Sequence, residues 1–492
     1  MPGWNSASSR HFSICSRSSD SKILQNRSAN WGVGWRTPQF VGTLRLLARK
    51  IKWDFLRFPV IDKGQSYTII YLVGCANILI PMAATISADQ ALVRELNLSL
   101  VLRYIHNEAP VSRAQIAHAT GLNKSTVSSL VEELLTRKLI HETGRNSVGT
   151  GRPATLLEVN PQAGGIIGAE LGVDFIAIAL TDFTGNILWR QLLDVDPSDA
   201  QETILSKTLT LADMAVEVCK AHNLDCLGLG LSVPGTVDLD RGILVFAPNL
   251  HWRNVPLKKI FSEHTGLNVY VENDANAAAI AEHLFGVARK SDDFIFVVVG
   301  IGIGGGLFLN GNLYRGKDGF AGEIGHTPIL SEPGQTLCHC GKRGCWETYA
   351  NQRSIIQKVQ ARLNGKKNSG NPFALEQQNG HLTISIIKQA ADEGNRESLD
   401  ALTETGAALG LGFASLIDIF NPEKIILGGP ISIVGKYLLP SIIDTASSHS
   451  FTATNPNAEI LLSSFKTDAV LIGAISIIVD DVLSNPTHVE RR

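Results

Sequence analysis

The stretch TLCHCGKRGCWET, residues 336–348, holds three of the chain's seven cysteines within eight residues. Cys338, Cys340 and Cys345 form a C-x-C-x4-C pattern, and the glycines between them let the backbone fold tightly around an ion. His326, twelve residues before Cys338, is the nearest candidate for a fourth ligand. The pattern predicts a tetrahedral, structural Cys3His zinc site. A disulfide or free thiols are the alternative, although a cytosolic protein keeps its thiols reduced.

Side chains suited to a sugar occur beside this loop and in one segment upstream of it. The run VYVENDANAAA predicts a strand that ends at Asn273 and Asp274, followed by a helix. Glu323 and His326 lie in FAGEIGHTP, and Glu347 follows the last cysteine by two positions. Each ring hydroxyl both donates and accepts hydrogen bonds, so carboxylate, amide and imidazole clusters are typical of sugar sites. Any one of these residues fits a cap or surface position equally well, but together they predict a sugar pocket with one wall held by the zinc loop.

Two apolar segments follow the same plan. Residues 163–191 predict a strand, a glycine turn and a second strand, and residues 292–316 repeat this and add an Asn-Gly hairpin turn. Helix and strand patterns alternate after each segment. This predicts a duplicated α/β fold with a cleft between two lobes, where glycine turns could cradle phosphates. We expect the first lobe over 163–285 and the second over 286–467.

Residues 88–160 have the pattern of a DNA-binding head. The first helical segment places Leu92, Leu96, Leu100 and Ile105 near one face. A short helix, a TGL turn and a second amphipathic helix follow, and then a strand, a glycine-rich loop and a strand. This order predicts a winged helix-turn-helix.

Short polar side chains open the second helix of that pair, where they suit base edges and phosphates. An arginine at the wing tip suits the negative potential of a minor groove. The alternative is a small helical module that binds other proteins. The candidate DNA-contacting residues are Asn123, Lys124, Ser125, Thr126, Ser128 and Arg152.

The composition of the first 81 residues differs from the rest. The whole chain has 492 residues and a net charge of −2, which points to no nucleic acid. Residues 1–81 carry 11 Lys and Arg against 3 Asp and Glu, a net charge of +8, so the remainder carries −10. We expect 1–81 to be an extension from a misassigned start, with the true start near Met82. The alternatives are a membrane segment in the uncharged run 64–88, or a small extra domain.

Several of these motifs together resemble the ROK family of repressors, open reading frames and sugar kinases. They are GHTPILSEPGQTLCHCGKRGCWET, ENDANAAA, SVPGTVDLDRGILVFAPNLHW and GIGIGGGLF, behind a winged helix. The resemblance covers about 88–485, and the order of parts is similar to the family's xylose-type and N-acetylglucosamine-type repressors. It implies a two-lobed actin-like ATPase fold, in which a C-terminal helix at 468–485 completes the first lobe, and zinc on His326, Cys338, Cys340 and Cys345. It also implies sugar contacts by Asn273, Asp274, Glu323, His326 and Glu347, with Asp274 at the position of the kinase base.

The chain departs from the kinase pattern at the phosphate-binding turns. Where kinases of the family have D-x-G-G-T, this chain has Glu170 and Asp174, and a negative charge there disfavours phosphate. Where kinases have G-T-G, Ile301 removes a hydroxyl donor. Phosphoryl transfer depends on positioning and charge neutralisation, so we expect no enzyme activity and no ATP cofactor.

The sequence therefore predicts a cytoplasmic, sugar-responsive transcriptional regulator, in first place a repressor released by a monosaccharide, for which the family resemblance implies xylose or another such sugar. Its expected partners are double-stranded operator DNA, a small sugar inducer and further copies of itself, as a homodimer or a dimer of dimers, with no membrane partner. An active ATP-dependent sugar kinase with a DNA-binding head is the main alternative, and a zinc-stabilised scaffold without ligand is another.

Overall fold

The computed structural model describes residues 69–75, 78–84, 90–146, 154–329, 336–364, 382–451 and 458–489, and it divides the chain into two units, 1–89 and 90–492. In the first unit, β1 (Ile69–Cys75) and β2 (Ile78–Ala84) form an antiparallel pair. These strands occupy the uncharged run in which the sequence allowed a membrane segment. The start predicted near Met82 stays a prediction.

The head at the beginning of the second unit is three helices and a small sheet. Ser112 and Gln115 cap each other at the start of the second helix, and Gly121 ends it in the left-handed conformation, so a tight turn leads into the third. The three-stranded sheet has the order β3-β5-β4. The head's elements are α2 (Gln90–Glu108), β3 (Val111–Ser112), α3 (Arg113–Thr120), α4 (Lys124–Thr136), β4 (Ile140–Asn146) and β5 (Ala154–Val159).

Helix α2 buries a different face from the expected one. Leu98, Val101, Leu102 and Ile105 are fully buried, whereas Leu92, Leu96 and Leu100 are exposed. Both sets have helical spacing, so periodicity alone does not separate them. The expectation was wrong for the three leucines because the head's core covers the other side of the helix.

The body consists of two five-stranded sheets with the same topology. The first has the order β13-β9-β6-β7-β8 and the second β18-β17-β14-β15-β16, so each strand has a counterpart. The predicted duplication of an α/β unit is confirmed. The first-sheet strands are β6 (Gly165–Leu171), β7 (Phe175–Thr181), β8 (Ile187–Asp194), β9 (Cys226–Val233) and β13 (Val269–Asn273); the second-sheet strands are β14 (Phe294–Val299), β15 (Ile303–Leu309), β16 (Asn312–Leu313), β17 (Lys424–Gly428) and β18 (Glu459–Leu462).

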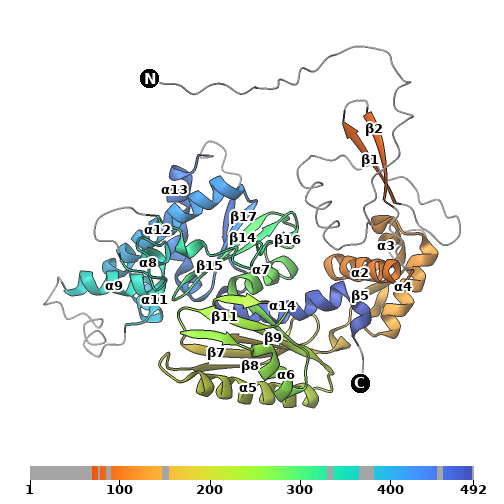
Figure 1. Cartoon of the computed structure of the whole chain (residues 1–492), viewed down its shortest axis with the longest axis horizontal. Helices are drawn as coiled ribbons and strands as arrows, with labels where there is room; N and C mark the ends of the chain where they lie inside the picture. Colours follow the sequence, from red (N-terminus) through yellow and green to blue (C-terminus); the bar gives the residue numbers. More distant parts are fainter. Residues whose placement is uncertain are drawn as a thin grey trace, which may run out of the picture. The chain divides into compact units, whose positions relative to one another are not determined.

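Helices cover both sheets, and α7 (Asp274–Leu284) and α14 (Ala469–Ser484) lie between the sheets (Figure 1). The first lobe also carries a small sheet of three strands beside the cleft. Its remaining elements are η1 (Pro161–Ala163), α5 (Gln201–Ala221), β10 (Thr236–Asp238), β11 (Ile243–Ala247), β12 (Trp252–Val255), α6 (Leu257–Thr265), α7 (Asp274–Leu284), η4 (Lys466–Asp468), α14 (Ala469–Ser484) and η5 (Pro486–His488). The second lobe adds η2 (Ile324–His326), α8 (Glu347–Ala350), α9 (Gln352–Asn364), α11 (Ile384–Asp392), α12 (Arg396–Phe420), η3 (Pro430–Val434) and α13 (Gly435–His449).

The two central helices, α7 and α14, pack closely on each other; α14 packs on β6 and β9 of the first sheet, and α7 packs mainly on β14 and β15 of the second. A Cβ atom added at Gly473 of α14 would lie 2.3 Å from the backbone of Ala277 in α7, and one at Gly230 of β9 would lie 1.9 Å from the carbonyl oxygen of Ala474. Only glycine permits these approaches. The C-terminal helix is therefore tightly packed into the first lobe.

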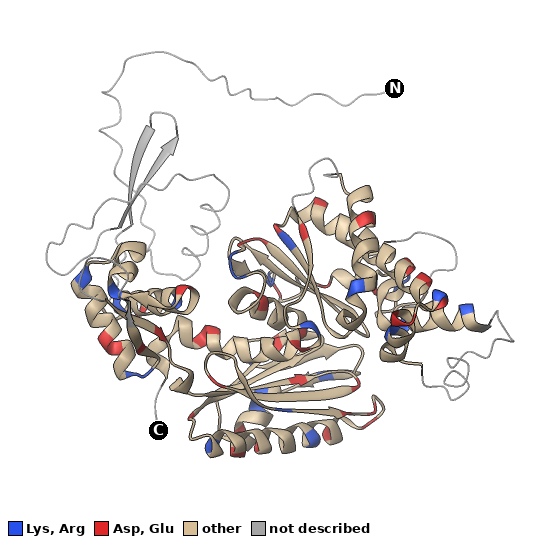
Figure 2. Cartoon of the chain, turned by 180° about the vertical axis from the view of Figure 1, so that it is seen from behind, with Lys and Arg blue, Asp and Glu red and all other residues tan. Residues whose placement is uncertain are grey.

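Helix α12 is, among the described residues, the one helix long and apolar enough to cross a membrane. More than half of its apolar window is buried within the protein, where it packs against α13. Lys and Arg are mixed with Asp and Glu over the described elements (Figure 2).

Candidate sugar and metal site

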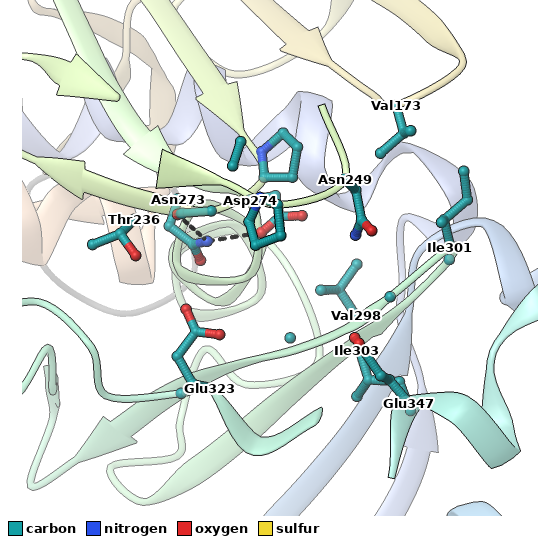
Figure 3. A pocket seen from close by; sticks show the side chains of 18 of the residues that line it. Val173, Thr236, Asn249, Asn273, Asp274, Val298, Ile301, Ile303, Glu323 and Glu347 are labelled. Carbon is teal, nitrogen blue, oxygen red and sulfur yellow. Dashed lines mark hydrogen bonds between the residues drawn. The ribbon is translucent and has the colours of Figure 1, made fainter. Parts of the chain in front are cut away.

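A cleft with a volume of about 340 Å³ is lined by residues of both sheets, which is within the usual range of small-molecule sites. Asn273, Asp274, Thr236 and Asn249 reach it from the first lobe, and Glu323 approaches from the opposite wall (Figure 3). The side chains predicted to bind a sugar are thus brought together around one cavity.

Asn273 ends β13 and caps α7. Its side-chain oxygen accepts from the backbone N–H groups of Ala275 and Asn276, at 3.0 and 3.1 Å. Its amide donates to the Gly235 carbonyl at 3.0 Å and to Asp274 Oδ1 at 2.9 Å. These bonds use the whole hydrogen-bonding capacity of the amide. A sugar would have to displace one of them to reach Asn273, so in this structure the residue positions Asp274.

Asp274 is the first residue of α7, and its Oδ1 also accepts from the Ala275 N–H at 2.8 Å. Burial and then the negative charge of Glu323 raise the pKa of Asp274 to about 7. Burial also raises the pKa of Glu323. The cleft therefore brings together carboxyl groups that resist simultaneous ionisation, and each can donate or accept a hydrogen bond.

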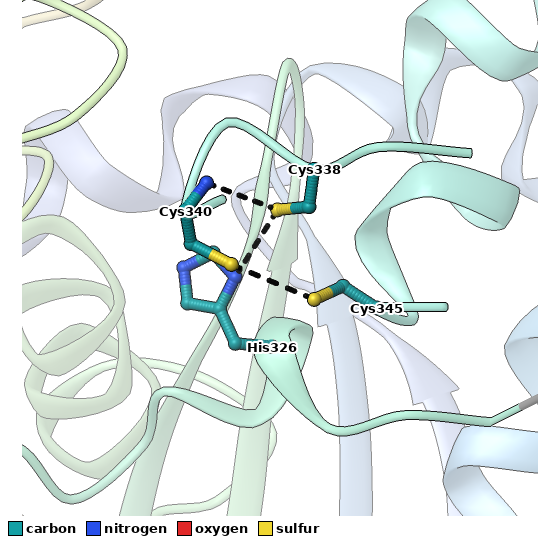
Figure 4. Close-up of side chains that lie close together, drawn as sticks. All are labelled: His326, Cys338, Cys340 and Cys345. Atoms are coloured by element: carbon teal, nitrogen blue, oxygen red, sulfur yellow. Dashed lines mark hydrogen bonds between the residues drawn. The ribbon is translucent and has the colours of Figure 1, made fainter. Parts of the chain in front are cut away.

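The cysteine loop stands beside these carboxyl groups. His326, Cys338, Cys340 and Cys345 place their ligand atoms within 4.8 Å of one another (Figure 4). The Cys340 and Cys345 sulfurs are 3.6 Å apart, and the Cys338 sulfur is 3.6 Å from His326 Nδ1. Zinc–ligand bonds of the usual lengths in a tetrahedron give about 3.8 Å between two sulfurs and about 3.6 Å between sulfur and nitrogen. The cluster thus has the dimensions of a metal site.

The cluster also contacts both the sugar-side residues and the lobe core. His326 Nε2 is 3.8 Å from Glu323, and Cys338 Sγ donates to Glu347 at 2.8 Å. Trp346, next to Glu347, is buried and donates its indole N–H to the Ala408 carbonyl in α12 at 2.9 Å. An ion held here would fix Glu347 through its chain neighbours.

Among the cleft residues that were not assigned a sugar role from the sequence are Thr236, Asn249 and Glu170. Thr236 and Asn249 lie in the motif SVPGTVDLDRGILVFAPNLHW, where a polar residue amid turn glycines and prolines was the available signal. Glu170 was read only as unfavourable to phosphate. The turn residues Asp174 and Ile301 line the same cleft.

The candidate DNA-contacting residues lie at the N-terminal end of α4. Lys124, Ser125 and Ser128 are exposed, and Thr126 is half-buried. Asn123 is exposed and caps the helix, accepting from the Thr126 N–H at 2.7 Å. Arg152 lies outside the described residues, so its predicted role stays a prediction.

The head contacts the body at the C-terminal ends of α7 and α14, among other places. Arg103 of α2 pairs with Asp480 of α14 at 2.8 Å, and Ser99 donates to the Leu483 carbonyl at 2.7 Å. Near the end of α7, Phe285 meets the ring of His106 edge to face at 5.5 Å. Both helices whose first residues border the cleft, α7 and α14, thus reach the head at their other ends.

Comparison with known proteins supports these assignments of fold. The ROK family model matches residues 166–481, and the MarR family model matches residues 99–152. The chain belongs to the ROK family. A xylose repressor of Caldicellulosiruptor bescii is 35% identical over 400 residues, 81% of this chain and 99% of that protein. The DNA-binding transcriptional dual regulator NagC of Escherichia coli is 30% identical over 372 residues, 76% of this chain and 89% of that protein.

Solved structures of the ROK family include both regulators and kinases. A ROK family transcriptional regulator, described as a homologue of the E. coli MLC protein, has a TM-score of 0.68 and 29% identity over 80% of this chain and 97% of its own. A ROK glucokinase from Streptomyces griseus, solved with glucose and AMPPNP, has a TM-score of 0.58 and 32% identity over 64% of this chain and 99% of its own. The regulator match thus covers more of this chain than the kinase match does.

Proposed function

We propose that this ROK protein is a sugar-responsive transcriptional repressor that binds operator DNA through its winged head. The xylose and N-acetylglucosamine repressors among its relatives support this, since they align over most of the chain. The observation that carries the proposal is the direct connection of cleft and head by α7 and α14. The inducer is a monosaccharide, with xylose as the first candidate.

Sugar binding releases DNA, in this proposal, by changing the relation between the lobes. Asp274 is contributed by the first lobe and Glu323 and Glu347 by the second, so a sugar that bonds to both favours a closed cleft. Helices α7 and α14 carry that change to α2, because the packing at Gly473 and Gly230 leaves little room for independent movement. The sugar only needs a higher affinity for the form whose heads do not fit the operator.

We propose that the metal is a structural zinc ion held by His326 Nδ1, Cys338, Cys340 and Cys345. The support is the donor set and its spacing. Zinc supplies no chemistry here beyond cross-linking the loop that carries Glu347. His326 Nε2 then remains directed toward Glu323 and the sugar.

We propose that the cleft transfers no phosphate. Asp274, with a pKa of about 7, has the properties of a general base, but a base alone does not bind ATP. Asp174 and Glu170 present carboxyl groups at the first hairpin, and Ile301 offers no hydroxyl at the second. ATP turnover on any hexose or pentose would contradict this part of the proposal.

The repressor is proposed to act in the cytoplasm as a homodimer or a dimer of dimers, so that two recognition helices meet a palindromic operator. The test is fluorescence anisotropy of the full chain on a duplex from the region upstream of its own gene, titrated with free monosaccharides. We expect tight binding that one sugar reverses. No DNA binding, or binding that no sugar changes, would contradict the proposal.

A further inference from the structure

Glu170 is a cleft residue whose carboxyl group has no hydrogen bond or ion pair with any residue the structure describes. It lies near the end of β6, lines the cavity, and is only 7% exposed. Strand register aligns it with Ser232 of β9, which in turn aligns with Glu272 of β13. Aligned residues of neighbouring strands project to the same face of a sheet, so the three side chains form one row.

The other two members of the row are occupied. Ser232 donates to the Val470 carbonyl of α14 at 3.4 Å. Glu272 pairs with Arg315 of the second lobe at 2.6 Å. All three side chains are buried and polar, but Glu170 alone of the three has no partner among the described residues, and it lines the cleft. A ligand in the cavity would supply the missing partner.

The charges around Glu170 determine the form in which it meets a ligand. The nearby carboxyl groups are Asp274 and Asp468, and the nearby cation is Arg190. Arg190 is already paired with Asp468 at 2.7 Å. Burial, followed by the charges of Asp274 and Asp468, holds the pKa of Glu170 well above its ordinary value. The raised pKa favours the protonated form of Glu170, so Glu170 can donate a hydrogen bond beside Asp274, which can accept one.

We propose that Glu170 contacts the sugar directly, sharing with Asp274 the hydroxyl group that points from the ring toward α7, and so helps to select the inducer. This rests on the proposed function. A hydroxyl group both donates and accepts, which matches a neutral acid beside a carboxylate. A ring that lacks the hydroxyl leaves Glu170 without a partner and removes one acceptor contact of Asp274, and unpaired polar groups in a site are an effective basis for rejecting a ligand.

The experiment is calorimetric titration of the full chain with the inducing sugar and with its deoxy analogues, one ring position at a time. Glu170→Leu removes both hydrogen-bonding atoms, and we expect it to weaken binding of the parent sugar about three- to tenfold. One deoxy analogue should lack the hydroxyl that both residues contact. For that analogue we expect Asp274→Asn and Glu170→Leu each to bind with the same affinity as wild type. Asp213→Asn, a change at an exposed carboxylate of α5 outside the cleft, serves as the control and should show no such coupling.

Glu170→Gln tests the inference independently, because it keeps the shape and a donor but cannot ionise. We expect its affinity to stay within about threefold of wild type between pH 6 and 8. A Glu170→Leu protein that binds every analogue as wild type does would overturn the inference, and so would a tenfold loss in Glu170→Gln. If these results occur while sugar still releases DNA, only the inference fails. If wild type binds no sugar at all, the proposed function fails with it.

Discussion

The two lobes of the body have the same fold but differ in the side chains that they present to the cleft. Their sheets share one strand order, and each begins with a hairpin whose turn faces the cleft. In the first lobe that turn carries Asp174, and in the second it carries Ile301 between glycines. The shared topology therefore positions the turns, and the side chains on them determine what the cleft accepts.

The lobes also differ in what lies behind the cleft. The second lobe holds its wall with the His/Cys cluster and with Trp346 buried against α12. The first lobe connects its wall to the head through α7 and α14. We infer that the second lobe keeps its sugar-binding groups fixed and that the first lobe transmits the signal.

The largest expected effect is at the second-lobe wall of the cleft, which the His/Cys cluster holds in place. Cys340→Ser should lose the metal and the sugar response together, because three ligands hold zinc poorly and the loop carrying Glu347 then loses its support. DNA binding should persist, since the head lies elsewhere. Elemental analysis and anisotropy measure the two effects. Cys219→Ser, at a buried cysteine outside the cluster, is the control. Unchanged metal content in Cys340→Ser would rule out the ligand set.

The next largest effect is expected at the first-lobe wall of the cleft, which α7 and α14 connect to the head. Asp274→Ala should weaken sugar binding about 10- to 100-fold, because it removes a charge-assisted hydrogen bond, while leaving operator affinity unchanged. Calorimetry and anisotropy on the same preparation provide the test. Asp213→Ala, at an exposed carboxylate of α5, is the matched control. Operator release by Asp274→Ala at the wild-type sugar concentration would mean that the pocket is assigned wrongly.

A smaller effect follows from the pKa of Asp274, which is about 7 in the folded protein and about 4 in an unfolded chain. Between these values the unfolded chain ionises while the folded protein keeps the proton, so Asp274 lowers stability as pH rises through this window. Asp274→Asn removes the penalty. Its melting temperature relative to wild type should therefore rise from pH 4 to pH 7 and then level off. A difference that does not change with pH would contradict the raised pKa.

The smallest effect is at the contact between head and body. The Arg103–Asp480 pair is partly exposed, and such pairs contribute up to about 1 kcal/mol. Arg103→Ala should reduce the factor by which sugar weakens operator binding by about fivefold or less. Lys220→Ala, which breaks an exposed pair within α5, should leave the factor unchanged. If sugar weakens operator binding by the same factor in Arg103→Ala and in Lys220→Ala, α2 and α14 do not carry the coupling through this contact.

The sequence predicted those features of the fold and the site that are built from residues close together in the chain. The three cysteines lie within eight residues, and their spacing alone places three ligands together. The two hairpins likewise show their strands and turns in the order of residues. The helix pair of the head begins and ends with capping residues, and these are also local signals.

Features that depend on contacts between distant segments were not predictable in this way. The partnerless state of Glu170 depends on three strands and on an ion pair between Arg190 and Asp468. The saturation of Asn273 depends on the Gly235 carbonyl, 38 residues away. The buried face of α2 is decided by what covers it, because two sets of leucines fit the same period.

The most direct test of the account is reciprocity between cleft and head. We would measure operator affinity of the full chain with and without saturating sugar, and sugar affinity with and without saturating operator. If the two sites are coupled through one pair of states, both ratios must equal the same factor. We predict equal factors of at least about fivefold, in the direction of mutual weakening. Sugar that binds the cleft with the same affinity whether or not the operator is present would contradict the account.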